Sequence, residues 1–138
     1  MNILTNGLNE LGIASNEAIV QKFETYLHEL KKWNKAYNLT AITNDGDIVV
    51  KHFLDSLLYI KAFSENISDI CDVGSGAGFP GIPLAIVMPA VHFVLIEPSR
   101  KRCAFLRHIK RTLSLSNVEV FEGRAEDIAD RTFDAVIT

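Results

Sequence analysis

The sequence has few cysteines and no long apolar run. Its two cysteines, Cys71 and Cys103, do not form a Cys-x-x-Cys pair and both lie in apolar stretches, which argues against a disulfide scaffold and predicts reduced, buried thiols. No stretch approaches the roughly 18 apolar residues of a membrane span, and the chain does not open with a secretory leader. We therefore expect a cytoplasmic protein that does not contact a membrane.

A strong charge of one sign is also missing. The chain has 14 lysines and arginines against 17 aspartates and glutamates, a net charge of -3. It is therefore not a polycation, and any surface that binds nucleic acid must be local. His28, His92 and His108 have no metal-ligand spacing, so we expect no metal site. A length of 138 residues, 48% of them hydrophobic, fits one soluble domain or one domain with a small accessory segment.

The first 66 residues have the apolar spacing of helices. Between Ser15 and Tyr37, apolar residues form one stripe with a period of 3.6, and Ser15 is the predicted N-cap. A shorter helix should precede it and stop near Gly12, and another is predicted from about Asp47 to Phe63. We interpret residues 1–66 as an N-terminal helical segment whose apolar stripes belong to the core.

The second half alternates short β-rich runs with helical ones. The strands predicted are "ISDICDV", "HFVLIE", "NVEVFEG" and "TFDAVIT", and helices are predicted for "PGIPLAIVM" and "SRKRCAFLRHIKRTL", the latter capped by Ser99. This alternation predicts an α/β, Rossmann-like parallel sheet with the strand order 3-2-1-4. We interpret residues 67–138 as the N-terminal half of a ligand-binding domain. Ligands of such sheets lie beyond the carboxyl ends of the strands.

A glycine-rich turn follows the first of these strands. The stretch "DVGSGAGFPGIP", residues 72–83, contains four of the eight glycines and two of the four prolines. It fits a dinucleotide fingerprint as well as the Asp72-x-Gly74-x-Gly76-x-Gly78 turn of S-adenosylmethionine enzymes. Both ligands need close approach to a glycine backbone.

The prolines favour S-adenosylmethionine. A pyrophosphate needs free N–H groups at a helix N-terminus, and Pro80 and Pro83 remove two of them. S-adenosylmethionine has no phosphate, and its methionine end needs a glycine backbone and a nearby acid. The residues predicted to serve it are Asp72, Gly74, Gly76 and Gly78, with Glu97 at the end of the second strand for the ribose and Ala125–Asp127 after the third for the adenine.

Five stretches in order carry a resemblance to a known family. They are "WNKAYNLTAI", "KHFLDSL", "DVGSGAGFPGIPLAI", "EPSRKRCAFLRH" and "GRAED". Together they resemble the glucose-inhibited division protein B family of bacterial small-subunit ribosomal RNA methyltransferases. The resemblance implies an S-adenosyl-L-methionine-dependent methyltransferase acting on N7 of guanine 527 of 16S rRNA. It also implies cofactor contacts at Gly74, Phe79, Ala125 and Glu126.

An RNA substrate requires a local positive surface despite the net negative charge. The stretch "RKRCAFLRHIKR" supplies one, with Arg100, Lys101 and Arg102 nearest the predicted cofactor site. Lysines of the helical half are a second candidate, and the residues concerned are Lys31, Lys32, Lys35 and Lys51. His52 and Asp55, one helical turn apart, are either structural or RNA-contacting. No catalytic side chain is assigned, because guanine N7 has an unprotonated lone pair and needs no general base.

Two alternatives in function stay open. Besides an rRNA methyltransferase, the sequence fits a methyltransferase of another substrate, such as a small molecule or a protein. It also fits a non-catalytic module that binds the cofactor or RNA. The run "TFDAVIT" would form an apolar, uncovered sheet edge, which is an aggregation hazard. We therefore expect the chain to be the N-terminal part of a longer protein.

Overall fold

A parallel sheet forms the centre of the second half of the chain. The structure, a computed structural model, describes residues 2–138. The strands are β1 (Asp69–Val73), β2 (His92–Glu97), β3 (Val118–Glu122) and β4 (Ala135–Ile137), in the order β3-β2-β1-β4 with parallel pairing throughout. The predicted order is confirmed. These runs form strands because β-branched and aromatic side chains fit a buried pleated surface.

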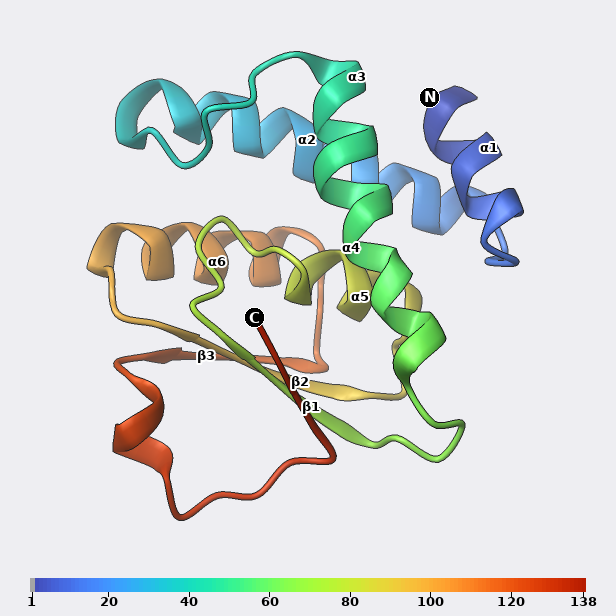
Figure 1. The fold of residues 1–138 in the computed structure, drawn as a ribbon. Coiled ribbons are helices and arrows are strands. Elements are labelled where there is room, and N and C mark those ends of the chain that lie inside the picture. Colours follow the sequence, from blue (N-terminus) through green and yellow to red (C-terminus); the bar gives the residue numbers. More distant parts are fainter. Residues whose placement is uncertain (1) are drawn as a thin grey trace.

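The long helices lie on one face of this sheet (Figure 1). Helices α5 (Gly81–Val87) and α6 (Arg100–Thr112) connect β1 to β2 and β2 to β3, and α2 (Glu17–Tyr37) packs over both. Helix α1 (Asn2–Glu10) packs at the side of this layer. The other face is covered by the β3–β4 segment, which contains the 3-10 turn η3 (Ala125–Ile128). The predicted α/β architecture is confirmed.

The predicted helix over residues 47–63 is present but is not a regular α-helix. It consists of α3 (Asp45–Asp47), the π-helix η1 (Ile48–Leu54), α4 (Asp55–Leu57) and the 3-10 helix η2 (Leu58–Ala62). The π segment opens with three consecutive β-branched residues, which fit an α-helix poorly. Among residues 2–138, no helix is both long enough and apolar enough to cross a bilayer.

Side chains alternate between the two faces of the sheet. Ile70 on β1 and Phe93 and Leu95 on β2 point toward the helices and join a core that also contains Phe23 and Phe53 of the N-terminal segment. A smaller cluster on the other face consists of Cys71, Val94, Ile96 and Ile128, with Phe121 and Phe133 at its margin. The division into segments 1–66 and 67–138 stays an interpretation, and the larger core contains side chains from both.

The helix caps agree with the sequence at α6 and differ at α2. Ser99 is the N-cap of α6 and accepts a hydrogen bond from the backbone of Arg102. For α2 the predicted cap, Ser15, is wrong. The N-cap is Asn16, whose side chain accepts from the backbone N–H of Ile19, while the Ser15 hydroxyl donates to Asn9. Asparagine and serine cap equally well, so the choice depends on where the chain turns.

Candidate functional site

The glycine turn is held by the end of β2. The backbone N–H groups of Gly74 and Ser75 donate to the Ile96 carbonyl at 2.8 and 3.1 Å, and Gly76 donates to Oε1 of Glu97 at 2.8 Å. The turn therefore lies at the carboxyl edge of the sheet, between the first two strands. In such sheets this edge is the usual ligand site.

Glycines of the turn are needed for two different reasons. Gly74 and Gly76 have φ values of 74° and 58°, and a β-carbon on either would meet no atom within 4 Å. A β-carbon on Gly78 would lie 2.6 Å from the Tyr26 hydroxyl, and one on Gly81 would lie 2.3 Å from Leu95. The first two glycines thus leave backbone open to a ligand, whereas the last two allow close internal packing.

The N-terminus of α5 has no N–H group left for a phosphate in this structure. Gly81 donates to Oδ2 of Asp72 at 3.0 Å, and Ile82 donates to the Gly78 carbonyl at 2.7 Å. Leu84 donates to the Pro80 carbonyl, and Pro83 has no N–H. This arrangement disfavours the dinucleotide fingerprint relative to the S-adenosylmethionine turn, because a pyrophosphate requires free N–H donors at this helix end.

Glu97 combines burial with a structural role. Its carboxylate is 3% exposed, and its two oxygens accept from the backbone of Gly76 and Ser99, each at 2.8 Å. A carboxylate oxygen has two acceptor positions, so both oxygens keep one for a ligand hydroxyl. The predicted ribose contact of Glu97 stays a prediction, while its role in fixing the turn is visible.

Asp72 lies beneath the turn, on the side of the helices. It is fully buried, and only its Oδ2 is hydrogen-bonded, to Gly81. Oδ1 is buried without a partner. Burial raises the pKa of Asp72 to about 7, and the Gly81 hydrogen bond offsets only part of that rise. A direct contact of Asp72 with a cofactor stays a prediction, whereas its contact with the α5 N-terminus is seen.

The predicted adenine residues follow β3 at the same edge of the sheet. Ala125 and Glu126 begin η3, and the Glu126 side chain is exposed. Gly123, just before them, donates its N–H to the Glu97 carbonyl at 3.0 Å, which links this turn to the end of β2. Asp127 accepts from the backbone of Arg124 and so closes the turn. Figure 1 shows the glycine turn, the start of α6 and η3 at one end of the sheet.

Phe79 connects the glycine turn to the helical layer. Its ring stacks on the His52 ring with centroids 4.3 Å apart and an angle of 8°, and on the Tyr26 ring at 5.6 Å. Nε2 of His52 shares a hydrogen bond with the Thr40 hydroxyl at 2.9 Å. Burial lowers the pKa of His52, against the opposing effect of Asp55. Lys51 is exposed and pairs with Asp47 at 3.9 Å. The cofactor contact of Phe79 stays a prediction.

The basic residues at the start of α6 face solvent, whereas Lys110 is half-buried and donates to the Val118 carbonyl. Cys103, Phe105, Leu106 and Ile109 are buried, while Arg100, Lys101 and Arg102 are exposed at the start of the helix. The Lys101 ammonium lies 5.7 Å from the centre of the Tyr37 ring, so it spans the gap to the end of α2. Further along, Arg107 pairs with Glu122 at 3.3 Å. The three leading cations are the ones placed next to the carboxyl edge.

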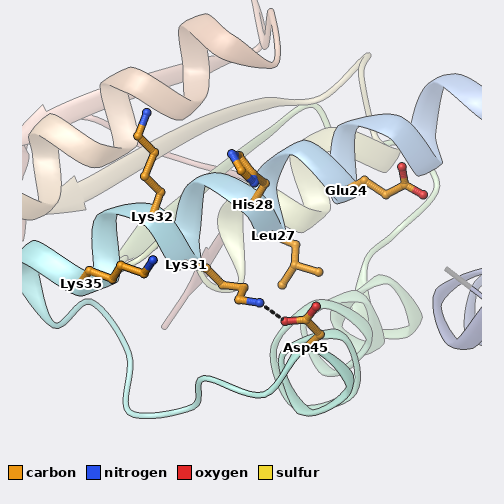
Figure 2. Close-up of a pocket in the computed structure, with 7 residues that line it drawn as sticks. All are labelled: Glu24, Leu27, His28, Lys31, Lys32, Lys35 and Asp45. Carbon is orange, nitrogen blue, oxygen red and sulfur yellow. Dashed lines mark hydrogen bonds and ion pairs between the residues drawn. The ribbon is translucent and has the colours of Figure 1, made fainter.

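A second basic surface lies on α2. A hollow of about 440 Å³ lies there. In Figure 2 Lys31 reaches Asp45, whereas Lys32 points to the opposite side of α2. Lys31 pairs with Asp45 at 2.6 Å, which joins α2 to α3. The hollow contains no residue of the glycine turn. Lys31, Lys32 and Lys35 line this hollow together with the acidic Glu24 and Asp45, whereas Lys51 lies elsewhere. The contact of these lysines with RNA stays a prediction.

One residue important for the site was not identified from sequence. The Tyr26 hydroxyl donates to the Ala77 carbonyl of the glycine turn at 2.6 Å. The pKa of this phenol is raised well above 10, mainly by burial and to a smaller extent by the nearby Asp72 carboxylate. Its only sequence signal was a position in the apolar stripe of α2, which many core residues share. Within residues 2–138 no three His, Cys, Asp or Glu side chains are grouped as metal ligands.

Comparison with known proteins gives a consistent family. The family described as "GidB: rRNA small subunit methyltransferase G" matches residues 19–138. A protein of Dehalococcoides mccartyi named "Ribosomal RNA small subunit methyltransferase G" is 47% identical over 129 residues, which are 94% of this chain and 55% of the relative. A protein of the same name from Leuconostoc citreum is 43% identical over 126 residues, 89% of this chain and 53% of the relative. The chain thus spans about half the length of these relatives.

Solved structures share the fold. A proposed O-methyltransferase from Klebsiella pneumoniae matches with a TM-score of 0.58 at 16% identity, over 95% of this chain and 56% of that one. Precorrin-6y C5,15-methyltransferase from Geobacter metallireducens matches with a TM-score of 0.52 at 20% identity, over 60% of this chain and 45% of that one. The sheet therefore has the Rossmann-like architecture of methyltransferases, as predicted from the sequence.

Proposed function

The chain belongs to the rRNA small subunit methyltransferase G family, and from that membership we propose that its protein transfers a methyl group from S-adenosyl-L-methionine to N7 of guanine 527 in 16S rRNA. The observation that carries the proposal is the glycine turn. It combines open backbone at Gly74 and Gly76 with a buried carboxylate at Glu97 and an α5 N-terminus whose N–H groups are all used. That combination suits a phosphate-free cofactor.

In this proposal, different residues of the carboxyl edge contact different parts of the cofactor. Gly74 and Gly76 hold the methionine end against their open backbone, and the predicted contact of Gly78 is indirect, because its close packing on Tyr26 shapes the turn. Glu97 accepts from the ribose hydroxyls with the acceptor positions it has left. Ala125 and Glu126 border the adenine. Phe79 closes the site from the side of the helices, where its ring is already fixed by His52 and Tyr26.

Methyl transfer to N7 makes modest chemical demands on the protein. The cofactor supplies a methyl group on a sulfonium, so the carbon–sulfur bond breaks as the carbon–nitrogen bond forms, and the positive charge passes from sulfur to the base. No proton moves in this step. The protein must hold nitrogen, carbon and sulfur in line, which is a proximity effect.

RNA is held by the cations next to the carboxyl edge in this proposal. Arg100, Lys101 and Arg102 start α6 beside Glu97, and Lys51 and His52 approach the glycine turn from the helical layer. Phosphate contacts of this kind position an RNA strand without reading its sequence. The proposed partner is 16S rRNA or a small-subunit particle that contains it.

The decisive experiment is product analysis. The purified protein carrying this chain is incubated with methyl-labelled S-adenosylmethionine and 16S rRNA that lacks the modification, and the RNA is digested to nucleosides. We expect 7-methylguanosine from a single position. A different methylated nucleoside would refute the proposed specificity. Cofactor binding with no transfer to RNA or to ribosomal particles would favour a binding module instead.

A further inference from the structure

A small hollow lies between the helical layer and the glycine turn. It has a volume of about 190 Å³, and its lining includes His52, Asp55, Tyr59, Phe79 and Pro80, with Thr138 after β4 at its border, where it accepts from the Tyr59 hydroxyl. Its size corresponds to about six water molecules at ~30 Å³ each, which is room for one planar base. Since Phe79 and Pro80 belong to the turn that leaves Gly74 open, an occupant of this hollow would lie next to the cofactor.

The hollow contains a rigid aromatic surface. The His52 and Phe79 rings are nearly parallel at 4.3 Å, and the Phe79 ring also packs on Tyr26 and lies 6.0 Å from Phe53. The hydrogen bond between Thr40 and His52 fixes the imidazole from the other side. His52 belongs to the π-helix η1, a type of irregularity that is frequent at functional sites. Stacking on such side chains is a general way to hold an unpaired base.

A carboxylate without a partner lies at the same place. Asp55 follows His52 by three residues, and both side chains line the hollow. Asp55 is exposed, and its charge acts on the neighbouring His52 ring, but within residues 2–138 its carboxylate is not seen in an ion pair or a hydrogen bond. By contrast, Asp45 and Asp47 of the same helical stretch pair with lysines. A carboxylate has only acceptors, so it selects a partner with adjacent donors.

We propose that this hollow is the subsite for the target guanine, with the base on the His52–Phe79 surface and the Asp55 carboxylate accepting hydrogen bonds from its N1–H and 2-amino group. This inference rests on the proposed function and adds to it the group that reads the base. Guanine offers two neighbouring donors on its Watson–Crick edge, which match two carboxylate oxygens. Adenine has an acceptor at N1, which the carboxylate repels. N7 lies on the opposite side of the purine and stays accessible to the methyl group.

Nucleotide binding tests the subsite without requiring catalysis. Guanosine, inosine and adenosine monophosphates are titrated into the protein and followed by the NMR signals of the His52 ring. Inosine lacks only the 2-amino group. A hydrogen bond to a charged group is worth about a tenfold to hundredfold change in affinity. We expect guanosine monophosphate to bind at least tenfold more tightly than inosine monophosphate and to shift the His52 signals.

Three variants separate the roles. Asp55→Asn should abolish the difference between guanosine and inosine monophosphate, whereas His52→Ala should weaken both by a similar factor. Asp45→Asn is the matched control, because it removes a carboxylate earlier on the same helical stretch whose partner, Lys31, also lies outside the hollow, and it should change neither affinity. Undetectable guanosine binding, equal binding of the three nucleotides, or an Asp55→Asn variant that still discriminates would each overturn the subsite.

The outcome for the subsite is independent of the outcome for the activity. Methyl transfer by the unmodified protein is measured in parallel. If transfer is absent but nucleotide selectivity is lost in Asp55→Asn, the proposed activity fails and the guanine site stands. If transfer occurs at N7 and Asp55→Asn supports it with unchanged kcat/KM, the activity stands and the guanine site fails.

Discussion

Gly74 and Gly12 have nearly the same φ angle in different surroundings. Their φ values are 74° and 73°, and a β-carbon on either would meet no atom within 4 Å. Replacing either by alanine therefore costs a similar 1–2 kcal/mol, roughly, for a left-handed residue with a side chain. We predict that Gly74→Ala abolishes or strongly weakens S-adenosylmethionine binding in calorimetry, while Gly12→Ala does not. Equal affinities in the two variants would show that the cofactor does not approach Gly74.

Asp72 should make the stability of the fold depend on pH. Burial raises its pKa from 3.8 to about 7 in the folded chain, so between these values the folded state keeps a proton that the unfolded state loses. Stability from this residue is complete below about pH 4 and is lost as the pH rises to 7. The rise corresponds to on the order of 4 kcal/mol of unfolding free energy. Urea unfolding from pH 4 to 8 measures it.

The control for this prediction is Asp72→Asn, which keeps an acceptor for the Gly81 N–H but cannot ionise. Its unfolding free energy should be nearly constant over the range in which the unmodified chain loses stability. If the two chains keep a constant difference from pH 4 to 8, Asp72 is ionised in the folded state throughout and the assignment is wrong.

Individual residues could be predicted from sequence where the signal is local. The glycines of the turn and Glu97 follow strands directly, and the structure places them at one edge of the sheet. The pairing of His52 with Phe79, by contrast, joins residues 27 positions apart. It depends on how α2 and η1 pack on the sheet, and no pattern of a single sequence encodes that contact. The same holds for the Tyr26 bond to Ala77.

At the scale of elements, the start of α6 should bind RNA phosphates. Arg100 and Arg102 are exposed, and Lys101 leans on Tyr37 without an acidic partner in the part of the chain described. We predict that changing all three to alanine weakens RNA binding and lowers the slope of log affinity against log salt by about 0.7–0.9 per lost phosphate contact. Fluorescence anisotropy with a labelled RNA at several salt concentrations measures both.

The matched comparison is the triple change of Lys31, Lys32 and Lys35 to alanine, which removes the same charge from the hollow of Figure 2. Cofactor affinity should stay the same in both triple variants. A salt slope that falls equally in both would show that RNA contacts the two surfaces alike. A slope that does not change in the α6 variant would mean that this helix face is only solvated.

Helices and strands could be predicted where the apolar residues follow one regular period. The strands and α6 were found where apolar alternation and a serine cap indicated them. The π-helix η1 was not, because its hydrophobic residues Ile48, Val49 and Phe53 fit an α-helical stripe equally well. The extra residue per turn is visible only in the hydrogen bond from Asp55 to Val50, five positions back.

At the scale of the whole molecule, strand β4 has one unpaired edge. It pairs with β1 on one side, no other described strand covers its second edge, and the Val136 side chain is 65% exposed. An apolar strand edge of this kind promotes pairing with another chain. We predict that residues 1–138 self-associate with rising concentration in light scattering, and that Val136→Lys suppresses this. A monodisperse unmodified chain would contradict the prediction.

The two faces of the sheet are covered differently, one by helices and the other by the β3–β4 segment. Cys71 and Cys103 should therefore become exposed to solvent at different rates. Cys71 is buried under the β3–β4 segment alone, whereas Cys103 belongs to α6 and donates to the Glu97 carbonyl. Burial raises the pKa of both thiols, that of Cys103 to about 11, so each reacts only when its cover opens. A short segment opens at a lower free energy than a packed helix layer. Under native conditions a thiol reagent should therefore modify Cys71 before Cys103 in mass spectrometry, and the reverse order would show that α6 is the looser cover.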